Sequence, residues 1–142
     1  MTTEPDRLLI ALLRENARAT TAELARKMGV SRTTVQSRIE RLQKRGIIEG
    51  YTVRLSQDYE QHLVKAHVLV TTLPKLTPRV VAGLAKIPDV RTVHSISGSF
   101  DLIVIVEASS IRDLDERIDR IGALDGVERT LSSIILSTRI DR

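Results

Sequence analysis

The sequence predicts an α+β chain in two parts, an N-terminal winged helix-turn-helix followed by a ferredoxin-like βαββαβ domain. Residues 20–42 hold two short amphipathic helical patterns separated by a glycine turn. After residue 61, strand-like and helix-like stretches follow in the order β-α-β-β-α-β. The 142 residues, 42% of them hydrophobic, suffice for two small cores. We place the first part at residues 1–50, a linker strand or hinge at 51–61 and the second part at 62–142.

Two helices are expected before residue 30. Pro5 and Asp6 suit the first turn of a helix, because Pro is tolerated there and an acid suits the positive helix end. Thr20 and Glu23 form the Thr-x-x-Glu capping box that begins a second helix, and Gly29 ends it after Met28. The apolar residues of the first helix that should face a core are Leu9, Ile10 and Leu13.

A third helix is expected to begin after Ser31 and to stop at Gly46. Its apolar stripe is Val35, Ile39 and Leu42. A rotation of 100° per residue from Val35 then turns a polar and basic side outward. Such a helix, placed after a tight turn, is the kind that enters the DNA major groove. The residues predicted to contact DNA are Thr33, Gln36 and Ser37 at base edges, Arg32, Arg38, Arg41 and Lys44 at phosphates, and Ser31 and Thr34 at the helix start.

Charge is concentrated on this segment. Residues 20–45 carry seven Lys or Arg and two Asp or Glu, whereas residues 51–142 carry twelve of each. A clustered basic surface is typical of a polyanion partner, here double-stranded DNA. The alternatives are a solvated helix face and a helix-turn-helix used only for packing or dimerisation. After this helix, residues 47–54 are β-favouring and predict a wing hairpin or a strand leading outward, and residues 56–61 read as a polar linker.

The second part is predicted as an antiparallel sheet with both helices on one face. Strands are expected at 66–72, 90–96, 102–106 and 127–136, and the helices are expected to be capped by Thr77-Pro78 and by Ser110. The other face needs a cover, since Val68, Val70, Val104 and Val106 are not expected all to point at the helices. A second copy of the sheet is the simplest cover, which predicts a homodimer.

The turn before the third strand is the most unusual local feature. It reads Ser97-Gly98-Ser99-Phe100-Asp101 and holds the only Phe of the chain beside a carboxylate. Free backbone N–H groups, hydroxyls and the Asp101 carboxylate together suit a zwitterion, although ordinary turn chemistry explains the same residues. Thr130 and Ser132 fall on one face of the last strand and add hydroxyls if that strand passes close by. The candidate effector residues are Gly98, Ser99, Phe100, Asp101, Thr130 and Ser132.

Several classes of site are disfavoured. The chain has no cysteine, which argues against disulfides and thiolate metal sites and fits a cytoplasmic location. The apolar run 8–13 is far shorter than the about 20 residues that span a bilayer, so we expect no membrane partner. The three histidines lack metal-ligand spacing, and the carboxylates of residues 113–119 interleave with arginines as surface ion pairs. We therefore expect no catalytic residue, metal or cofactor.

Residues along both parts form one two-part signature. In the first part it comprises Asp6, Ile10, Leu13, residues 16–18, 23–25 and 29–31, Val35, Arg38, Ile39, Leu42, residues 46–48, Gly50 and Tyr51. In the second part it comprises residues 97–102, Gly126, Val127 and Thr130. By this signature the chain resembles, almost from end to end, the Lrp/AsnC or feast/famine family of transcriptional regulators.

The resemblance implies a winged DNA reader joined to an amino-acid-responsive domain, and dimers that often assemble into an octameric disc. It also implies an effector at a dimer–dimer contact near Gly98–Asp101, with Thr130 and Ser132 contributing. This chain departs from many members by the polar pair Ser132-Ser133, where they have bulkier apolar residues, so its pocket is expected to be more polar or altered. Haem-pathway decarboxylases share the architecture, but their basic and histidine-containing substrate motifs are not found.

The expected function is therefore a sequence-specific DNA-binding transcriptional regulator. Its second part, residues 62–142, is expected to oligomerise and to sense an amino acid or a similar small molecule. Two alternatives stay open: an architectural DNA-wrapping protein with little sequence preference, and a decarboxylase-like enzyme.

Overall fold

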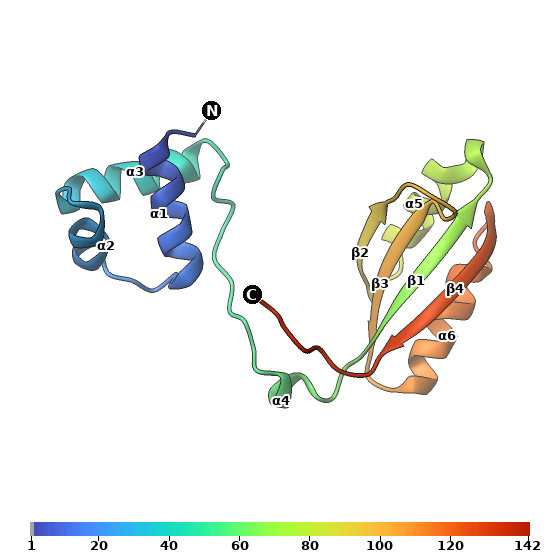
Figure 1. Ribbon diagram of the computed structural model, residues 1–142. Helices are drawn as coiled ribbons and strands as arrows, with labels where there is room; N and C mark the ends of the chain where they lie inside the picture. Colours follow the sequence, from blue (N-terminus) through green and yellow to red (C-terminus); the bar gives the residue numbers. More distant parts are fainter. Residues whose placement is uncertain (1) are drawn as a thin grey trace. The chain divides into compact units, whose positions relative to one another are not determined.

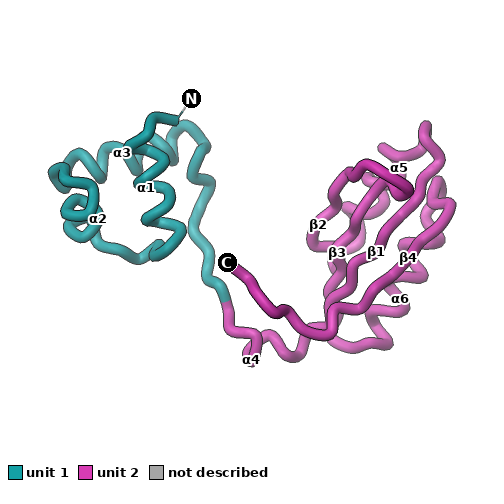
Figure 2. The backbone as a smooth tube through the Cα atoms, in the orientation of Figure 1, with its two compact units in different colours: residues 1–54 teal, residues 55–142 magenta. Residues whose placement is uncertain are grey.

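The computed structural model describes residues 2–142, which form two compact units. Unit 1 comprises residues 1–54 and unit 2 comprises residues 55–142 (Figure 2). The division falls inside the segment 51–61 that the sequence marks as a linker. Each unit has its own hydrophobic core.

Unit 1 is built from the helices α1 (Glu4–Glu15), α2 (Thr21–Met28) and α3 (Arg32–Lys44). The capping box of α2 is confirmed, because the Thr20 hydroxyl accepts from the Glu23 backbone and the Glu23 carboxylate accepts from the Thr20 backbone. Gly29 follows with φ +67°, a conformation that favours glycine. The N-cap of α1 is Thr3, whose partner in a second capping box is Asp6.

The core of unit 1 lies where the three helices meet. Leu9, Leu24, Val35 and Leu42 are almost completely buried in it, and Ile39 packs against it as a half-buried residue. The inward stripe predicted for α3 is therefore confirmed.

The segment after α3 does not form the predicted wing hairpin, nor a strand. Residues 47–56 carry no helix or strand, and Tyr51 and Val53 are exposed. β-favouring residues form a strand only when a neighbouring strand completes their hydrogen bonds, and within residues 2–142 this segment has no such neighbour. A one-turn helix, α4 (Gln57–Glu60), follows and is capped by Ser56.

Unit 2 is a four-stranded antiparallel sheet covered on one face by two helices (Figure 1). The strands are β1 (Val64–Thr72), β2 (Val90–Ser95), β3 (Leu102–Ala108) and β4 (Val127–Ile135), in the spatial order β2-β3-β1-β4. The helices are α5 (Thr77–Ala85), preceded by the 3₁₀ turn η1 (Pro74–Leu76), and α6 (Ile111–Gly122). The ferredoxin-like arrangement predicted from the sequence is confirmed.

The prediction that Val68, Val70, Val104 and Val106 cannot all face the helices is wrong. All four are completely buried, in one cluster with residues of α5 and α6. The register explains it: Val68 pairs with Val104 and Ala66 with Val106, and paired residues share a face.

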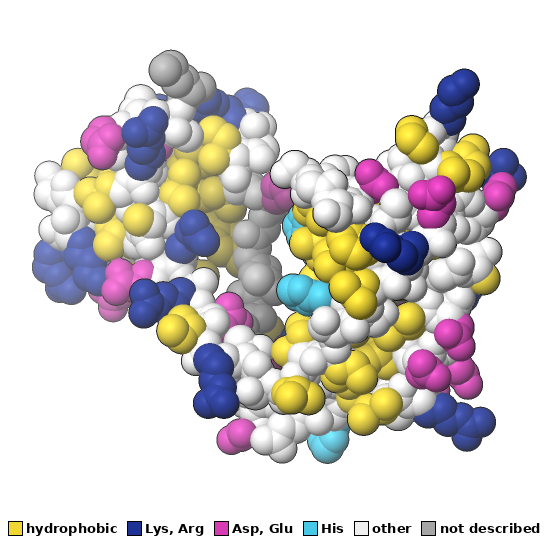
Figure 3. Space-filling model, turned by 45° about the vertical axis from the view of Figure 1, so that its right-hand side comes forward, with side chains coloured by type: hydrophobic (Ala, Val, Ile, Leu, Met, Phe, Trp, Pro, Cys, Tyr) yellow, Lys and Arg dark blue, Asp and Glu magenta, His cyan; other side chains and the backbone are white. Residues whose placement is uncertain are grey.

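The opposite, open face of the sheet carries the alternate residues of the same strands. Its apolar members are Leu69, Ile103, Ile105, Leu131 and Ile135, and His67 and His94 stand among them. None of these seven residues is buried, and Leu131 is 54% exposed. Figure 3 shows hydrophobic side chains gathered on unit 2 with histidines beside them. The sheet thus does leave an apolar face without a cover, although not the face made by the four valines.

Two helix starts in unit 2 differ in their chemistry. Ser110 caps α6 as predicted, because its hydroxyl accepts from the Asp113 backbone. Thr77 does not cap α5: it is already the first helical residue, and its hydroxyl bonds the Thr72 hydroxyl instead. The sequence before Pro78 therefore predicts the helix start to within one residue but not the capping interaction.

Candidate functional site

The outward side of α3 is the first candidate site. Arg32, Thr33 and Ser37 are exposed, as are Gln36 and Lys44, whereas Arg38 is half-buried. Helix α2 and the turn at Gly29, whose backbone is in the left-handed conformation, fix the position of the start of α3. The structure therefore brings these predicted DNA-contacting residues onto one helix.

Hydrogen bonds already occupy some of the polar groups on this side. The Ser31 hydroxyl accepts from the Thr34 backbone and pairs with the Thr34 hydroxyl at 2.8 Å. The Gln36 amide donates to Glu40 at 3.3 Å on the exposed surface. Ser31 and Thr34 thus fix the start of the helix, while Thr33 and Ser37 make no side-chain hydrogen bond within residues 2–142.

Arg41, predicted to contact a DNA phosphate, also forms an ion pair that the sequence analysis did not predict. Its guanidinium donates to the carboxylate of Asp6 at 3.0 Å, and that carboxylate is only 1% exposed. The pair joins α3 to the start of α1. Arg41 itself is half exposed, so it positions α3 and still presents part of its guanidinium to solvent.

Asp6 is a buried carboxylate whose charge is compensated locally. Burial raises its pKa, but hydrogen bonds from Thr3 and from Arg41 outweigh that effect, and the pKa lies below its ordinary value. Because the pKa is lower in the folded chain than in the unfolded chain, the ionised carboxylate stabilises unit 1 above the ordinary pKa of 3.8. This stabilisation is lost as the pH falls through the folded pKa.

We expect Asp6→Asn to lower the unfolding free energy of unit 1 by about 2 kcal/mol near neutral pH. The variant should also flatten the loss of stability on acidification below about pH 5. Amide hydrogen exchange in α1 and α3 measures both quantities for this unit alone. Asp115→Asn, on the exposed side of α6, is the matched control. Identical pH profiles for Asp6→Asn and the parent would contradict the role given to Asp6.

The second candidate site, which we call the turn site, is the corner between β2 and β3 and the strand ends beside it. Gly98 has φ +105°, so the turn depends on glycine. The Asp101 backbone N–H donates to the Val70 carbonyl at 2.9 Å, and Oδ2 of its carboxylate accepts from the Thr72 backbone at 2.8 Å. Asp101 therefore fastens the turn to the end of β1, a structural role beside its predicted ligand role.

Sequence reasoning missed Arg129 as part of this corner. Its guanidinium carbon lies 5.1 Å from the centre of the Phe100 ring, a cation–π contact. Arg129 also pairs with Thr71 in the β1–β4 ladder. The Thr71 hydroxyl is buried and is the one buried side-chain polar atom without a hydrogen-bond partner among residues 2–142. Only the sheet register reveals this arrangement, because Arg129, Phe100 and Thr71 are far apart in sequence.

Thr130 and Ser132 lie on β4 with their side chains on the helix-covered face, since they pair with the buried Val70 and Val68. Thr130 is half-buried. Its strand partner is Val70, whose carbonyl accepts the hydrogen bond from the Asp101 N–H, so Thr130 and Asp101 lie at the same end of the sheet. Ser132 lies two residues further from that end. Strand β1 separates both of them from β3.

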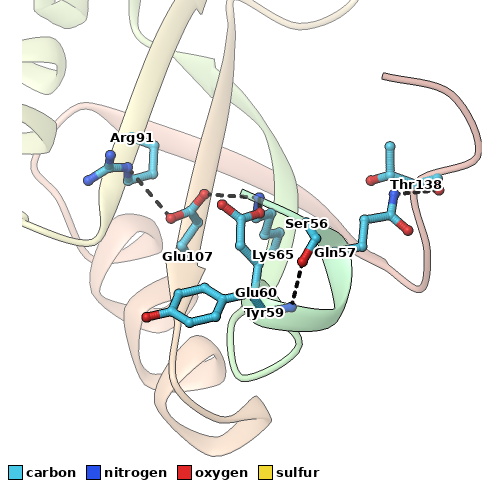
Figure 4. Close-up of polar contacts among 8 residues, drawn as sticks. All are labelled: Ser56, Gln57, Tyr59, Glu60, Lys65, Arg91, Glu107 and Thr138. Carbon is cyan, nitrogen blue, oxygen red and sulfur yellow. Dashed lines mark hydrogen bonds and ion pairs between the residues drawn. The ribbon is translucent and has the colours of Figure 1, made fainter. Parts of the chain in front are cut away.

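A charged network lies at the other end of the open face (Figure 4). The Lys65 ammonium is 3.4 Å from carboxylate oxygens of both Glu60 and Glu107, and Glu107 also pairs with Arg91. Burial lowers the pKa of Lys65, but these two carboxylates outweigh it and hold the pKa above its ordinary value. Because Glu60 belongs to α4, the network fastens the short helix to the sheet.

The ion pairs predicted among the α6 carboxylates are confirmed for Glu116 alone within residues 2–142. Arg112 and Arg117 both lie within 4 Å of Glu116, and Arg117 also binds Asp89. Within residues 2–142, no three acidic or histidine side chains are grouped so that they could hold a metal ion. No helix of the described chain has the length and apolar character needed to cross a membrane.

Comparison with known proteins assigns the two units. A model described as Lrp/AsnC ligand binding domain matches residues 65–142, and a winged helix-turn-helix DNA-binding model matches residues 3–49. The chain belongs to the Lrp/AsnC family. Among curated members, it is 37% identical to the HTH-type transcriptional regulator LrpA of Mycobacterium tuberculosis over 94% of this chain and 89% of that protein. It is 35% identical to the regulator LysM of Saccharolobus solfataricus over 95% and 94%.

Solved structures of the Lrp/AsnC family agree with this fold. Escherichia coli AsnC has a TM-score of 0.87 and 28% identity, with 100% of this chain and 97% of that chain covered. A feast or famine regulatory protein from M. tuberculosis, complexed with L-methionine, has a TM-score of 0.84 and 36% identity, with coverage of 97% and 94%. The chain is thus a transcriptional regulator with a helix-turn-helix and an Lrp/AsnC ligand-binding domain. The curated relatives bear the names of transcriptional regulators.

Proposed function

We propose that this Lrp/AsnC protein binds specific DNA sites through α3 and changes that binding when an amino acid occupies the turn site. The exposed polar and basic side of α3 carries the DNA part of the proposal. Thr33, Gln36 and Ser37 are the groups for base edges, and Arg32, Arg38 and Lys44 are the groups for phosphates. Arg41 combines a phosphate contact with its anchoring of α3 to Asp6.

Footprinting on genomic fragments tests the DNA part. A bounded, palindromic protected region is expected, because two readers related by a two-fold axis match half-sites about one helical turn apart. Protection that spreads along the DNA without sequence preference would favour an architectural DNA-wrapping protein instead. No protection at low salt would overturn both readings.

The amino-acid part of the proposal draws on the turn site and on one relative. The M. tuberculosis regulator at 36% identity was crystallised with L-methionine. In this chain, the turn site combines exposed backbone, the hydroxyls of Ser97 and Ser99 and the Asp101 carboxylate. Thermal denaturation with each of the twenty amino acids is the test, because a ligand that binds the folded state raises the melting temperature by mass action.

A homodimer, further assembled into an octamer, completes the proposal. The open face of the sheet is apolar, and a second copy of the same face would cover it. Residues 51–55 supply a second surface: the apolar Tyr51, Val53 and Leu55 alternate there and are exposed. Such an unpaired, β-favouring segment suits pairing with the same segment of another copy.

We expect Leu131→Asp to weaken dimerisation at least about tenfold, since burying a leucine is worth about 1.5–3 kcal/mol. Leu131 is 54% exposed in the single chain, so the substitution should not disturb its core. Ile111→Asp is the matched control, because Ile111 is 63% exposed at the start of α6 and outside the open face. Sedimentation velocity measures the assembly. A parent protein that is monomeric at micromolar concentration, or a Leu131→Asp variant that dimerises like the parent, would refute this interface.

A further inference from the structure

The guanidinium of Arg129 is held in place by the Phe100 ring, but its hydrogen-bond donors have no partner within residues 2–142. It lies over the Phe100 ring, and within residues 2–142 it neither pairs with a carboxylate nor donates a hydrogen bond. A guanidinium that packs on an aromatic ring presents its flat face to the ring, which leaves the N–H groups along its edge free. Its five donors in that plane match a carboxylate, often with two parallel bonds. Arg129 is exposed, so a ligand can reach this edge.

The groups around Arg129 form a continuous corner. Arg129 makes the cation–π contact with Phe100. The next residue, Asp101, accepts a hydrogen bond from the Thr72 backbone. Thr71, beside Thr72, is the strand partner of Arg129. Within the described chain, the Thr71 hydroxyl in this corner is buried and has no partner. Buried polar groups usually have a hydrogen-bond partner, so this corner is unusual in leaving one hydroxyl unpaired.

The corner offers two places for negative charge and one for positive charge. The backbone N–H groups of residues 97–100 make no hydrogen bond within residues 2–142, so they are available to an α-carboxylate. Oδ1 of Asp101 accepts no hydrogen bond there either, because Oδ2 alone binds Thr72, so it is available to an ammonium group. The Arg129 guanidinium is then available to bind a second carboxylate, on the side chain of the ligand.

We propose that the ligand of the turn site is a dicarboxylic amino acid and that Arg129 selects it by binding the side-chain carboxylate. This inference rests on the proposed amino-acid response and names the class of amino acid. A ligand with a neutral side chain leaves the Arg129 donors without a charged partner. An arginine–carboxylate pair joins two opposite charges through two parallel hydrogen bonds, which a neutral amide cannot match, so the preference should be large.

Isothermal titration calorimetry of the full chain with L-aspartate, L-glutamate, L-asparagine, L-glutamine and L-methionine tests the proposal. We expect aspartate or glutamate to bind at least about tenfold more tightly than its own amide and than methionine. Arg129→Gln should abolish that preference and leave the affinity for the amide within about twofold. Arg129→Lys, which keeps the charge but loses the planar fork, should retain part of the preference.

Arg120→Gln on the exposed side of α6 is the matched control, because it removes one cation from unit 2 outside the turn site. Preferential binding of methionine or an amide by the parent would overturn the inference but leave the amino-acid response standing. If Arg129→Gln still preferred acidic amino acids as the parent does, Arg129 would not be the residue that selects the ligand. Failure of every amino acid to bind, in calorimetry and in thermal denaturation, would overturn the inference and the proposed response together.

Discussion

Replacing both Arg32 and Arg38 with Ala is expected to weaken binding to every DNA sequence, by roughly a hundredfold at low salt. Both side chains lie on α3, and we assign them to phosphates. Each lost phosphate contact removes nearly one unit from the slope of log affinity against log salt concentration, so the double variant should lose about two units. Fluorescence anisotropy with specific and random duplexes over a range of salt concentrations measures both effects.

The control for this double variant is Arg112→Ala with Arg120→Ala. It removes the same charge from the surface of α6 in unit 2, and Arg112 is 89% exposed there. The control should leave the affinity and the salt slope within error of the parent, because salt largely screens exposed charges that do not contact the DNA. Equal slopes for the parent and the α3 double variant would show that Arg32 and Arg38 do not bind phosphates.

Substitution of Asp101 separates its two roles. Asp101→Ala removes the acceptor of the Thr72 N–H and is expected to lower the unfolding free energy of unit 2 by about 1–3 kcal/mol. Asp101→Asn keeps an oxygen for that N–H and removes only the charge. We expect it to stay close to the parent in stability and to lose the response to the amino acid, because nothing remains to pair with the ligand ammonium.

Urea denaturation measures the stability of both variants, and DNA binding with and without amino acid measures the response. Asp125→Asn is the matched control, since Asp125 is an exposed carboxylate paired with Arg79 outside the turn site. DNA affinity without amino acid should be the same in Asp101→Asn and the parent. A normal response in Asp101→Asn would show that the carboxylate does not bind the ligand.

The elements that sequence reasoning predicted correctly are those encoded by neighbouring residues. The capping box of Thr20 and Glu23, the glycine turn at Gly29 and the cap at Ser110 all depend on contacts within a few positions. The stripe of α3 also follows from helical spacing alone. The missing wing is different, because a hairpin needs a partner strand that local sequence cannot guarantee.

The candidate sites needed information that is not local. The sequence marked the turn at Gly98, but the part of Arg129 in that corner depends on the register that sets β4 against β1. The four valines illustrate the same limit. Their alternation along each strand showed that they share a face, whereas only the pairing of β1 with β3 showed that both strands turn that face to the helices. Likewise, the anchoring of Arg41 by Asp6 joins residues 35 positions apart.

The charged network around Lys65 shortens the linker between the two units. Ile47 and Ile48 still donate to the Leu42 carbonyl of α3, and Glu60 of α4 is held to the sheet, so the stretch between these two attachments and before the Ser56 cap is residues 49–55. Seven extended residues reach at most about 25 Å. In the proposed dimer, one more helical turn of DNA between half-sites would add about 34 Å, a distance that the linkers of the two copies would have to share. If two copies read one DNA site as proposed, the length of this linker therefore bounds the half-site spacing that they can reach.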